Sequence, residues 1–173
     1  MRLDRNQGYL LSMTDPLNAL QSFQQELRHG KIKVQRGVLD RNLFLHQDSP
    51  DGEPRFTYVR LKGKTVTALV MFALDEPIKR TLCFGIGYAV PDAYRNQGRA
   101  QEALSAALSE LQHGLGRAGI TDFYVEAIVG ADNKSSQRVA EHVISNTPVA
   151  VKEKISGLPA FQYIRRIEQT TAI

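Results

Sequence analysis

The sequence contains no tryptophan and one cysteine, Cys83, in 173 residues. A single cysteine cannot form an internal disulfide bond, so we expect a fold held together by its core in a reducing cytoplasm. No apolar run approaches the roughly 20 residues of a membrane-spanning helix, and the N-terminal stretch lacks the apolar core of a signal peptide. These absences argue against a disulfide-stabilised secreted domain and predict no membrane association.

The sequence also lacks a dense basic stripe with interleaved aromatic residues, so we expect no nucleic-acid partner. The net charge is +4, and the whole excess lies in residues 1–64, which hold eleven Lys and Arg against seven Asp and Glu. This basic part either attracts an anionic ligand or forms a solvated face. The four histidines show no metal-ligand spacing, so we expect no metal.

Apolar periodicity predicts both helices and strands. Helical spacing covers 15–30, 98–116 and 133–144. Strand patterns cover 37–47, 55–61, 65–74, 80–90, 122–129, 149–154 and 160–167, with a hairpin turn at Gly63. This order predicts an α/β (α+β) fold with a single mixed, largely antiparallel sheet of six to seven strands, flanked by helices. A crossover joins two parallel strands in the middle of that sheet.

Three glycine-containing stretches are candidates for a phosphate loop, and two lie in the wrong context. GLGRAG at 114–119 matches the dinucleotide pattern, but a helix precedes it and a strand follows it. Its glycines are predicted to cap a helix and form a turn. GIGYAV at 85–90 lies inside a strand, where its glycines are predicted to mark a bulge or a close backbone approach.

The third stretch, RNQGRA at 95–100, follows a strand and opens the long helix. Backbone N–H groups at a helix N-terminus lack partners and carry partial positive charge, so a phosphate can bind there. Gly98 lets a ligand approach the backbone closely, and Arg95 and Arg99 can add charge-assisted contacts. The Lys-Ser/Thr pair of a P-loop is missing, which argues against magnesium–nucleotide chemistry.

Arg95-Asn96-Gln97-Gly98-Arg99-Ala100 resembles the Q/R-x-x-G-x-G/A acyl-CoA signature of the GNAT N-acetyltransferase superfamily. The preceding IGYAVPDAY resembles that family's splayed central strand. EAIVGADNKSSQRVAEHV at 126–143 resembles the next strand and helix, in the N-x-x-S variety of ribosomal-protein N-terminal acetyltransferases. The resemblance implies central parallel strands that part like a V around acetyl-CoA. It also implies one domain over 1–173, with an acceptor-side part (1–64), an acyl-CoA-binding core (65–146) and a C-terminal hairpin (147–173).

The resemblance further implies which residues contact the cosubstrate. Strand backbone would pair with the acetyl and pantetheine groups, loop amides would hold the pyrophosphate, and the following helix would start beside the pantetheine arm. The implied strand contacts are Tyr88 and Val90. The implied loop contacts are Arg95, Asn96, Gln97, Gly98, Arg99 and Ala100. The implied contacts at the start of the helix are Asn133 and Ser136. Structural roles remain open for several of them: a helix N-cap at Asn133 or Asp132, a solvated Ser136, and surface charges at the two arginines.

Acetyl transfer from a thioester to an amine needs a base for the amine, a donor for the developing oxyanion and a proton for the thiolate. The backbone N–H of Tyr88 is the expected oxyanion donor. Ala140 stands where family members often carry a proton-donating tyrosine, and the early-strand glutamate of some members is absent. Glu126 is the remaining candidate base. The alternatives are a solvent-facing Glu126, a role for Tyr124 or Tyr163, and proton loss through a water chain.

These observations predict an acetyl-CoA-dependent N-acetyltransferase that works by direct attack of a primary amine. The acceptor is a protein or peptide N-terminus or a small amine, bound between residues 15–33 and 148–161. Because two common catalytic groups are missing, an acyl-CoA-binding regulatory module without turnover is the alternative. Whether the chain forms a homodimer is left open.

Overall fold

The fold of residues 15–170, described by a computed structural model, is built on one eight-stranded sheet. The strand order is β1-β2-β3-β4-β5-β6-β8-β7. The strands are β1 (Gln35–Arg36), β2 (Leu43–Asp48), β3 (Arg55–Lys62), β4 (Thr65–Ile78), β5 (Thr81–Ala89), β6 (Asp122–Gly130), β7 (Val149–Lys152) and β8 (Pro159–Glu168). The helices are α2 (Pro16–Arg28), α3 (Arg99–Arg117) and α4 (Lys134–Val143), with 3-10 turns η1 (Pro50–Gly52) and η2 (Asp92–Tyr94).

The predicted fold class is confirmed, but the sheet has one strand more than the six to seven expected. Residues 37–47, predicted as one strand, divide into a loop and β2, and the short β1 precedes the loop. The cause is the buried carboxylate of Glu110 on α3. It accepts hydrogen bonds from the backbone N–H groups of Val38, Leu39 and Asp40, at 3.0, 2.6 and 2.7 Å. Donors engaged in this way cannot pair with a neighbouring strand.

Helix α2 begins where the sequence predicts. The side chain of Asp15 accepts hydrogen bonds from the backbone N–H groups of Leu17 and Asn18, at 3.0 and 3.2 Å, which satisfies two of the otherwise unpaired donors of the first turn. Leu20 and Phe23, three residues apart, are the buried side chains of the helix. They hold α2 against β3 and β4.

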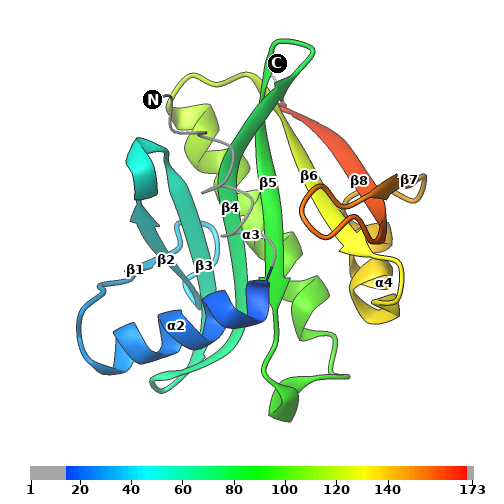
Figure 1. Ribbon diagram of the computed structural model, residues 1–173. Coiled ribbons are helices and arrows are strands. Elements are labelled where there is room, and N and C mark those ends of the chain that lie inside the picture. The colour runs from blue at the N-terminus through cyan, green and yellow to red at the C-terminus, as the bar shows by residue number, and fades with distance from the viewer. Residues whose placement is uncertain (1–14, 171–173) are drawn as a thin grey trace, which may run out of the picture.

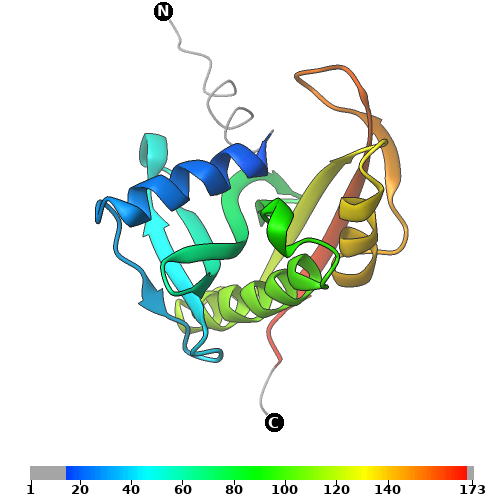
Figure 2. The same ribbon diagram turned by 90° about the horizontal axis from the view of Figure 1, so that it is seen from below.

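Apolar layers cover both faces of the sheet. One layer packs α3 and α4 against side chains such as Phe84 and Phe123, and the other packs α2 against Leu69 and Met71. Figure 2 shows α2 and α3 on opposite sides of the sheet. On the α2 side, no helix of the described chain lies over β6, β8 and β7, and Ile128 is 42% exposed there. The site described below therefore has a covered face and a more open one.

One glycine in each of the two rejected loop candidates has the structural role that the sequence predicts, whereas Gly114 and Gly116 lie inside α3 and do not cap it. Gly119 follows the end of α3 with φ +85°, and the N–H of Ile120 bonds the carbonyl of Leu115 at 3.0 Å, which closes the helix as a Schellman turn. Gly87 on β5 allows a close approach, because a Cβ there would lie 3.3 Å from Cγ of Pro16.

Cys83 is a core residue, as predicted, and is 1% exposed. Burial, followed by the charges of Glu126 and Asp75, raises the pKa of its thiol to about 12. Its thiolate is therefore scarce at neutral pH. Within residues 15–170, each helix is too short or too polar to cross a lipid bilayer.

Candidate active site

The candidate site is a V between the two parallel strands at the centre of the sheet. β5 and β6 pair only from Cys83↔Tyr124 to Gly85↔Glu126, and both strands then continue without pairing to each other. Beyond that point each strand pairs on its outer side only, β5 with β4 and β6 with β8. Figure 1 shows the two strands together in their upper part and apart below. Their facing edges therefore offer backbone groups to a ligand.

The loop predicted to bind phosphate lies directly after β5, where α3 begins. Gly98 is the N-cap of α3 with φ +70°, and none of the described side chains caps this end of the helix. Asn96 also has a positive φ, +59°. A Cβ built on Gly98 would meet nothing within 4 Å, so the space in front of the first amides of α3 is open. An uncapped helix start with room in front of it suits an anion.

The two arginines of the loop are held in different ways. Arg95 donates from Nε to the carbonyl of Val90 at 3.1 Å and pairs with Asp92 at 2.7 Å. Arg99 donates from Nε to Gln97 at 3.2 Å, and its guanidinium lies 5.0 Å from the ring centroid of Tyr94. Arg95 thus ties the end of β5 to the loop, and Arg99 lies at the helix start with its charge uncompensated by a carboxylate among the described residues.

Tyr88 contributes more than the backbone group expected from the sequence. Its side chain crosses from β5 to α4 and donates from the hydroxyl to the carbonyl of Ser136 at 2.5 Å. The backbone N–H of Ala140 also lies beside this hydroxyl. Burial is the main cause that raises the pKa of Tyr88, so the phenol is protonated at neutral pH. A phenol therefore lies beside Ala140, the position where the resemblance places a tyrosine.

Asn133 is the N-cap of α4. Its side-chain oxygen accepts hydrogen bonds from the backbone N–H of Ser136 at 3.2 Å and from the hydroxyl of Ser135 at 3.3 Å. This finding assigns the cap to Asn133 rather than Asp132. The ligand contacts predicted for Asn133 and Ser136 stay predictions, and both residues lie at the end of α4 that borders the V.

Glu126 lies at the point of the V, in register with Gly85. Its neighbours Val125 and Ala127 are buried in the α3–α4 layer, so its own side chain projects to the opposite face. Gln162 of β8 donates to its carboxylate at 2.9 Å. Burial raises the pKa of Glu126, and this hydrogen bond opposes the rise. The carboxyl group is therefore a better proton acceptor than an exposed glutamate.

The two weaker tyrosine candidates lie on different faces of the sheet. Tyr163 is buried in the α3–α4 layer, opposite Ala127 on β6. Tyr124 is partly exposed and projects to the same face as Glu126. In residues 15–170 no group of three or more His, Cys, Asp and Glu side chains could hold a metal ion. Sequence reasoning missed the Tyr88–Ser136 and Gln162–Glu126 contacts, because each joins residues more than 35 positions apart.

Comparison with solved structures supports the fold. RimL, a ribosomal L7/L12 alpha-N-protein acetyltransferase, in complex with coenzyme A, is 22% identical over 65% of this chain and 62% of its own, with a TM-score of 0.48. The ligand-free structure of RimL is 20% identical to this chain, and the match covers 67% of this chain and 72% of RimL with a TM-score of 0.50. The ribosomal-protein-S5-alanine acetyltransferase of Vibrio fischeri gives 12% identity, 70% and 64% coverage, and a TM-score of 0.52.

The matched part of the chain spans less than two thirds of the coenzyme A-bound RimL chain. Identities this low indicate a shared fold and nothing more specific. No curated protein matches the sequence. The acetyltransferase (GNAT) family matches residues 20–143, well over half of the chain, and the match includes the V, the loop and α4. The chain therefore belongs to the GNAT acetyltransferase family.

Proposed function

We propose that this protein is an N-acetyltransferase that moves the acetyl group of acetyl-CoA to a primary amine. The observation that carries the proposal is the continuity of the V with the uncapped start of α3. Acetyl-CoA carries a thioester at one end and a pyrophosphate further along. A site for it therefore needs the V for the thioester and, next to the V, a helix start for the pyrophosphate. The family membership of the chain supports the same activity.

The residues of the V and the loop fit acetyl-CoA. The amides of Gln97 to Ala100 and the charge of Arg99 would hold the pyrophosphate, in the open space in front of Gly98. The free edge of β5 at Tyr88 would pair with the acetyl and pantetheine groups. The carbonyl of Val90 already accepts from Arg95, so Val90 has one acceptor lone pair left for the same purpose. Bound there, acetyl-CoA supplies an activated acetyl group.

Glu126 is the base in this proposal. Its carboxylate accepts the proton of the attacking amine, and the backbone N–H of Tyr88 stabilises the charge that develops on the acetyl oxygen. The reaction is a direct transfer: the N–C bond forms, the C–S bond breaks, and the proton leaves the amine for Glu126. The raised pKa of Glu126 supports this role.

The phenol of Tyr88 is the proton donor for the departing sulfur. It lies on the α3–α4 side of the V, whereas Glu126 projects to the opposite side, so base and acid approach the acetyl group from two faces. The hydroxyl turns from the carbonyl of Ser136 to the sulfur and gives its proton to the thiolate. The resulting phenolate is reprotonated through water with the proton that Glu126 accepted from the amine, so both groups return to their starting states. Tyr88 thus takes the role that Ala140 cannot perform.

We further propose a protein or peptide N-terminus as acceptor. Two of the solved structures with this fold are named as acetyltransferases of ribosomal proteins. Ile128 is exposed on the face of β6 that carries Glu126, and no helix of residues 15–170 covers that face, which supports a peptide over a fully enclosed small amine.

The test is thiol release from acetyl-CoA against a panel of peptides with free N-termini and small amines, with mass spectrometry of the products. We expect acetylated peptide, and release that depends on both substrates. Coenzyme A binding without release on any acceptor would instead support a regulatory module without turnover.

A further inference from the structure

Four of the six large apolar side chains that the described residues expose lie at one end of the sheet. Ile128 is on β6, Val149 is on β7, and Ile155 and Leu158 are in the β7–β8 turn, with exposed fractions of 42, 58, 49 and 64%. Single exposed apolar residues are common on protein surfaces, whereas a group of them marks a binding surface. These four residues are called the β7 patch below.

The strand residues of the β7 patch lie on the face of the sheet that carries Glu126. Ile128 and Glu126 are two residues apart on β6, so their side chains project to the same side. Ile128 pairs with Gln162 of β8, and Gln162 pairs with Val149 of β7, so the three form one row across three strands. Gln162, in the middle of the row, also donates to the carboxylate of Glu126 at 2.9 Å. The row therefore lies directly beside the proposed base.

Hydrogen bonds within the β7–β8 turn fix its shape. The carboxylate of Glu153 accepts from the backbone N–H groups of Ile155 and Ser156, at 3.4 and 3.1 Å. The N–H of Gly157 donates to the carbonyl of Glu153 at 2.8 Å, and the N–H of Leu158 donates to the hydroxyl oxygen of Ser156 at 3.1 Å. The four N–H groups of residues 155–158 are therefore all engaged inside the turn.

The β7–β8 turn stands on the same side of the sheet as Glu126. Figure 2 shows the turn on the side that also carries α2, and Figure 1 shows it in front of β6. Because its N–H groups are engaged, the turn offers a ligand mainly the side chains of Ile155 and Leu158. Together with Ile128 and Val149, they form an apolar surface beside the V.

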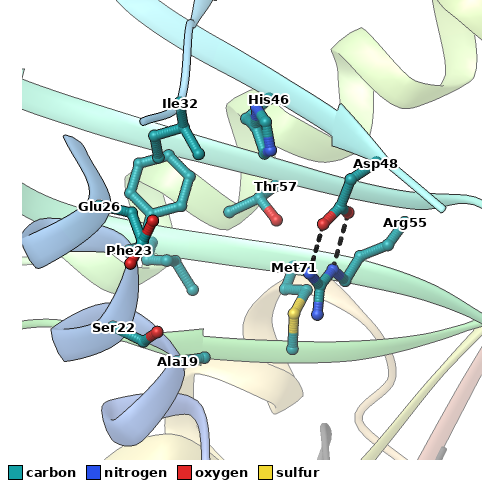
Figure 3. A pocket seen from close by; sticks show the side chains of 11 residues that line it. Ala19, Ser22, Phe23, Glu26, Ile32, His46, Asp48, Arg55, Thr57 and Met71 are labelled. Atoms are coloured by element: carbon teal, nitrogen blue, oxygen red, sulfur yellow. Dashed lines mark hydrogen bonds and ion pairs between the residues drawn. The ribbon is translucent and has the colours of Figure 1, made fainter. Parts of the chain in front are cut away.

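A cavity of about 200 Å³, the α2 cavity, lies on the other side of the V, between α2 and strands β2 to β4 (Figure 3). Its lining includes no residue of β5, β6, β7 or β8. Arg55 donates to the two carboxylate oxygens of Asp48 at 2.9 and 2.5 Å, and Glu26 lies 3.8 Å from Nζ of Lys31. The carboxylates and the guanidinium group of the α2 cavity are thus already paired, and it is the β7 patch that borders Glu126.

The position of Ile128 relates the β7 patch to an acceptor peptide. Along β6 from Glu126, this face carries the ion pair of Asp122 and Arg166 in one direction and Ile128 in the other. An extended chain covers about 3.3 Å per residue, so Ile128 lies about 7 Å from Glu126 along the strand. A peptide whose amine is at Glu126 and which follows β6 towards Gly130 therefore places its second and third residues beside the β7 patch. A large apolar side chain there buries the patch, whereas a serine leaves it exposed.

We propose that the β7 patch binds a large apolar side chain at the second or third residue of a peptide acceptor. Ile128 and Val149 contact this side chain from the strands, and Ile155 and Leu158 contact it from the turn. This inference rests on the proposed function, because it takes the acetylated amine to lie at Glu126.

The first experiment measures binding and needs no turnover. Eight-residue peptides with an acetylated N-terminus carry leucine at positions 2 and 3, serine at both, or serine there with leucine at positions 7 and 8. Their dissociation constants are measured by fluorescence anisotropy in the presence of coenzyme A. We expect the peptide with leucine at positions 2 and 3 to bind at least 10-fold more tightly than the serine peptide. The peptide with leucine at positions 7 and 8 should stay within 3-fold of the serine peptide, because those residues lie roughly 20 Å from Glu126.

Variants assign this preference to the β7 patch. Val149→Ser and Leu158→Ser are each expected to reduce the ratio of the serine and leucine dissociation constants to below 3-fold. Val38→Ser is the matched control, because Val38 is 57% exposed in the loop of residues 37–42, and it keeps the wild-type ratio. Thermal unfolding confirms that each variant is folded. Equal binding of the leucine and serine peptides, or a preference that survives both patch variants, overturns the inference.

Analytical ultracentrifugation tests the other occupant of an apolar surface, a second copy of the chain. We expect the same sedimentation coefficient for the wild type and Val149→Ser over a wide range of protein concentration. A wild-type dimer that Val149→Ser dissociates would show that a second copy covers the β7 patch, and it would overturn the inference.

A third measurement separates this inference from the proposed function. The same peptides with free N-termini are tested as acceptors by thiol release. Acetylation of all of them at equal kcat/KM removes the β7 patch from acceptor recognition and leaves the N-acetyltransferase standing. A leucine preference in binding without acetylation of any peptide retains the β7 patch as a peptide-binding site and refutes the proposed activity.

Discussion

At the scale of single residues, the most informative position is Gly98. Its φ of +70° is in the left-handed region, and its missing side chain leaves open the space in front of α3. A substitution at Gly98 has two effects that can be measured separately. Backbone strain lowers the free energy of unfolding, whereas a new side chain in the open space lowers the affinity for the ligand.

We expect Gly98→Val to lower coenzyme A affinity by at least 10-fold, because a β-branched side chain would stand where phosphate oxygens approach the amides, and each charge-assisted contact contributes about 1.5–3 kcal/mol. Strain should also lower the free energy of unfolding by about 1–2 kcal/mol. Isothermal titration with coenzyme A and with pantetheine, beside urea unfolding, measures both effects.

Gly63 provides the matched control. It has φ +61° and equally open surroundings, but lies in the β3–β4 turn. Gly63→Val should lose similar stability and no coenzyme A affinity. If Gly98→Val binds coenzyme A as well as the wild type does, the loop holds no phosphate, and the proposed function loses its main support.

Glu126 allows a pH prediction. Because burial raises its pKa, the ionised base is lost at a higher pH than for an ordinary glutamate, so kcat should fall as the pH is lowered through that raised value. Gln162→Leu removes the hydrogen bond that lowers the pKa, so the acidic limb of the pH profile should move to higher pH. Glu126→Gln should lower kcat by about 10²-fold and abolish the limb. An unchanged profile in both variants would exclude Glu126 as the base.

The raised pKa of Glu126 also predicts how the free energy of unfolding changes with pH. This change has the opposite sign to that of kcat. A carboxyl group whose folded pKa is raised binds more protons folded than unfolded, so its contribution to stability falls as the pH rises from the unfolded to the folded pKa. Glu126→Gln should therefore gain stability relative to the wild type at pH 7, and this gain should vanish below the unfolded pKa of about 4.3. Urea unfolding at both pH values measures it.

Tyr88 is expected to act through its hydroxyl. Tyr88→Phe keeps the ring and removes the proton donor, so kcat should fall by about 10- to 100-fold while the dissociation constant of coenzyme A stays within about 2-fold. Tyr124→Phe, on the neighbouring strand, is the control. A wild-type kcat in Tyr88→Phe would show that the departing sulfur takes its proton from water.

At the scale of elements, the loop of residues 37–42 depends on α3 rather than on its own sequence. Glu110 is buried and accepts three backbone hydrogen bonds from it. Gly37 is required there, because a Cβ would lie 2.3 Å from the carbonyl oxygen of Asp40 and 2.6 Å from the Glu110 carboxylate. This contact ties β1 and β2 to the helix that follows the candidate phosphate loop.

Glu110→Gln should lower the free energy of unfolding by on the order of 3 kcal/mol, because at least one N–H group of the loop then faces an amide donor instead of a carboxylate. Urea unfolding measures the loss, and Glu141→Gln on α4 serves as a control at an exposed helical position. Equal unfolding midpoints for Glu110→Gln and the wild type would show that the loop holds its shape without the carboxylate.

At the scale of the whole molecule, the sheet consists of two parts joined by a short parallel ladder. β1 to β5 form one part and β6, β8 and β7 the other, and three register pairs of β5 and β6 connect them in the sheet. The helices α3 and α4 add contacts between the parts. A ligand in the V would bridge the same two strands where they have parted.

Coenzyme A at 100 times its dissociation constant should therefore raise the free energy of unfolding by about 2.7 kcal/mol and the melting temperature by roughly 5–10 °C. Hydrogen exchange of the amides in 86–89 and 127–130 should slow on binding, because these edges gain a partner. Stabilisation without slower exchange in either segment would place coenzyme A elsewhere on the molecule.

The sequence by itself determined the features that depend on local spacing. Alternating apolar residues identify most strands, and spacings of three and four identify α3. The phosphate contact expected at Gly98 stays a prediction. The order of these elements predicted a mixed sheet with parallel central strands, since a strand–helix–strand crossover permits that pairing. Such signals lie within one element or between elements that follow each other along the chain.

The tertiary structure alone decided which distant residues meet. Glu110 converts a predicted strand into a loop, Tyr88 reaches the carbonyl of Ser136 across the V, and Gln162 sets the environment of Glu126. The α2 cavity likewise requires a helix and three strands to come together. Periodicity states which face of an element is buried, but not which residue of another element it meets there. That choice depends on packing across the sheet, which the local pattern does not encode.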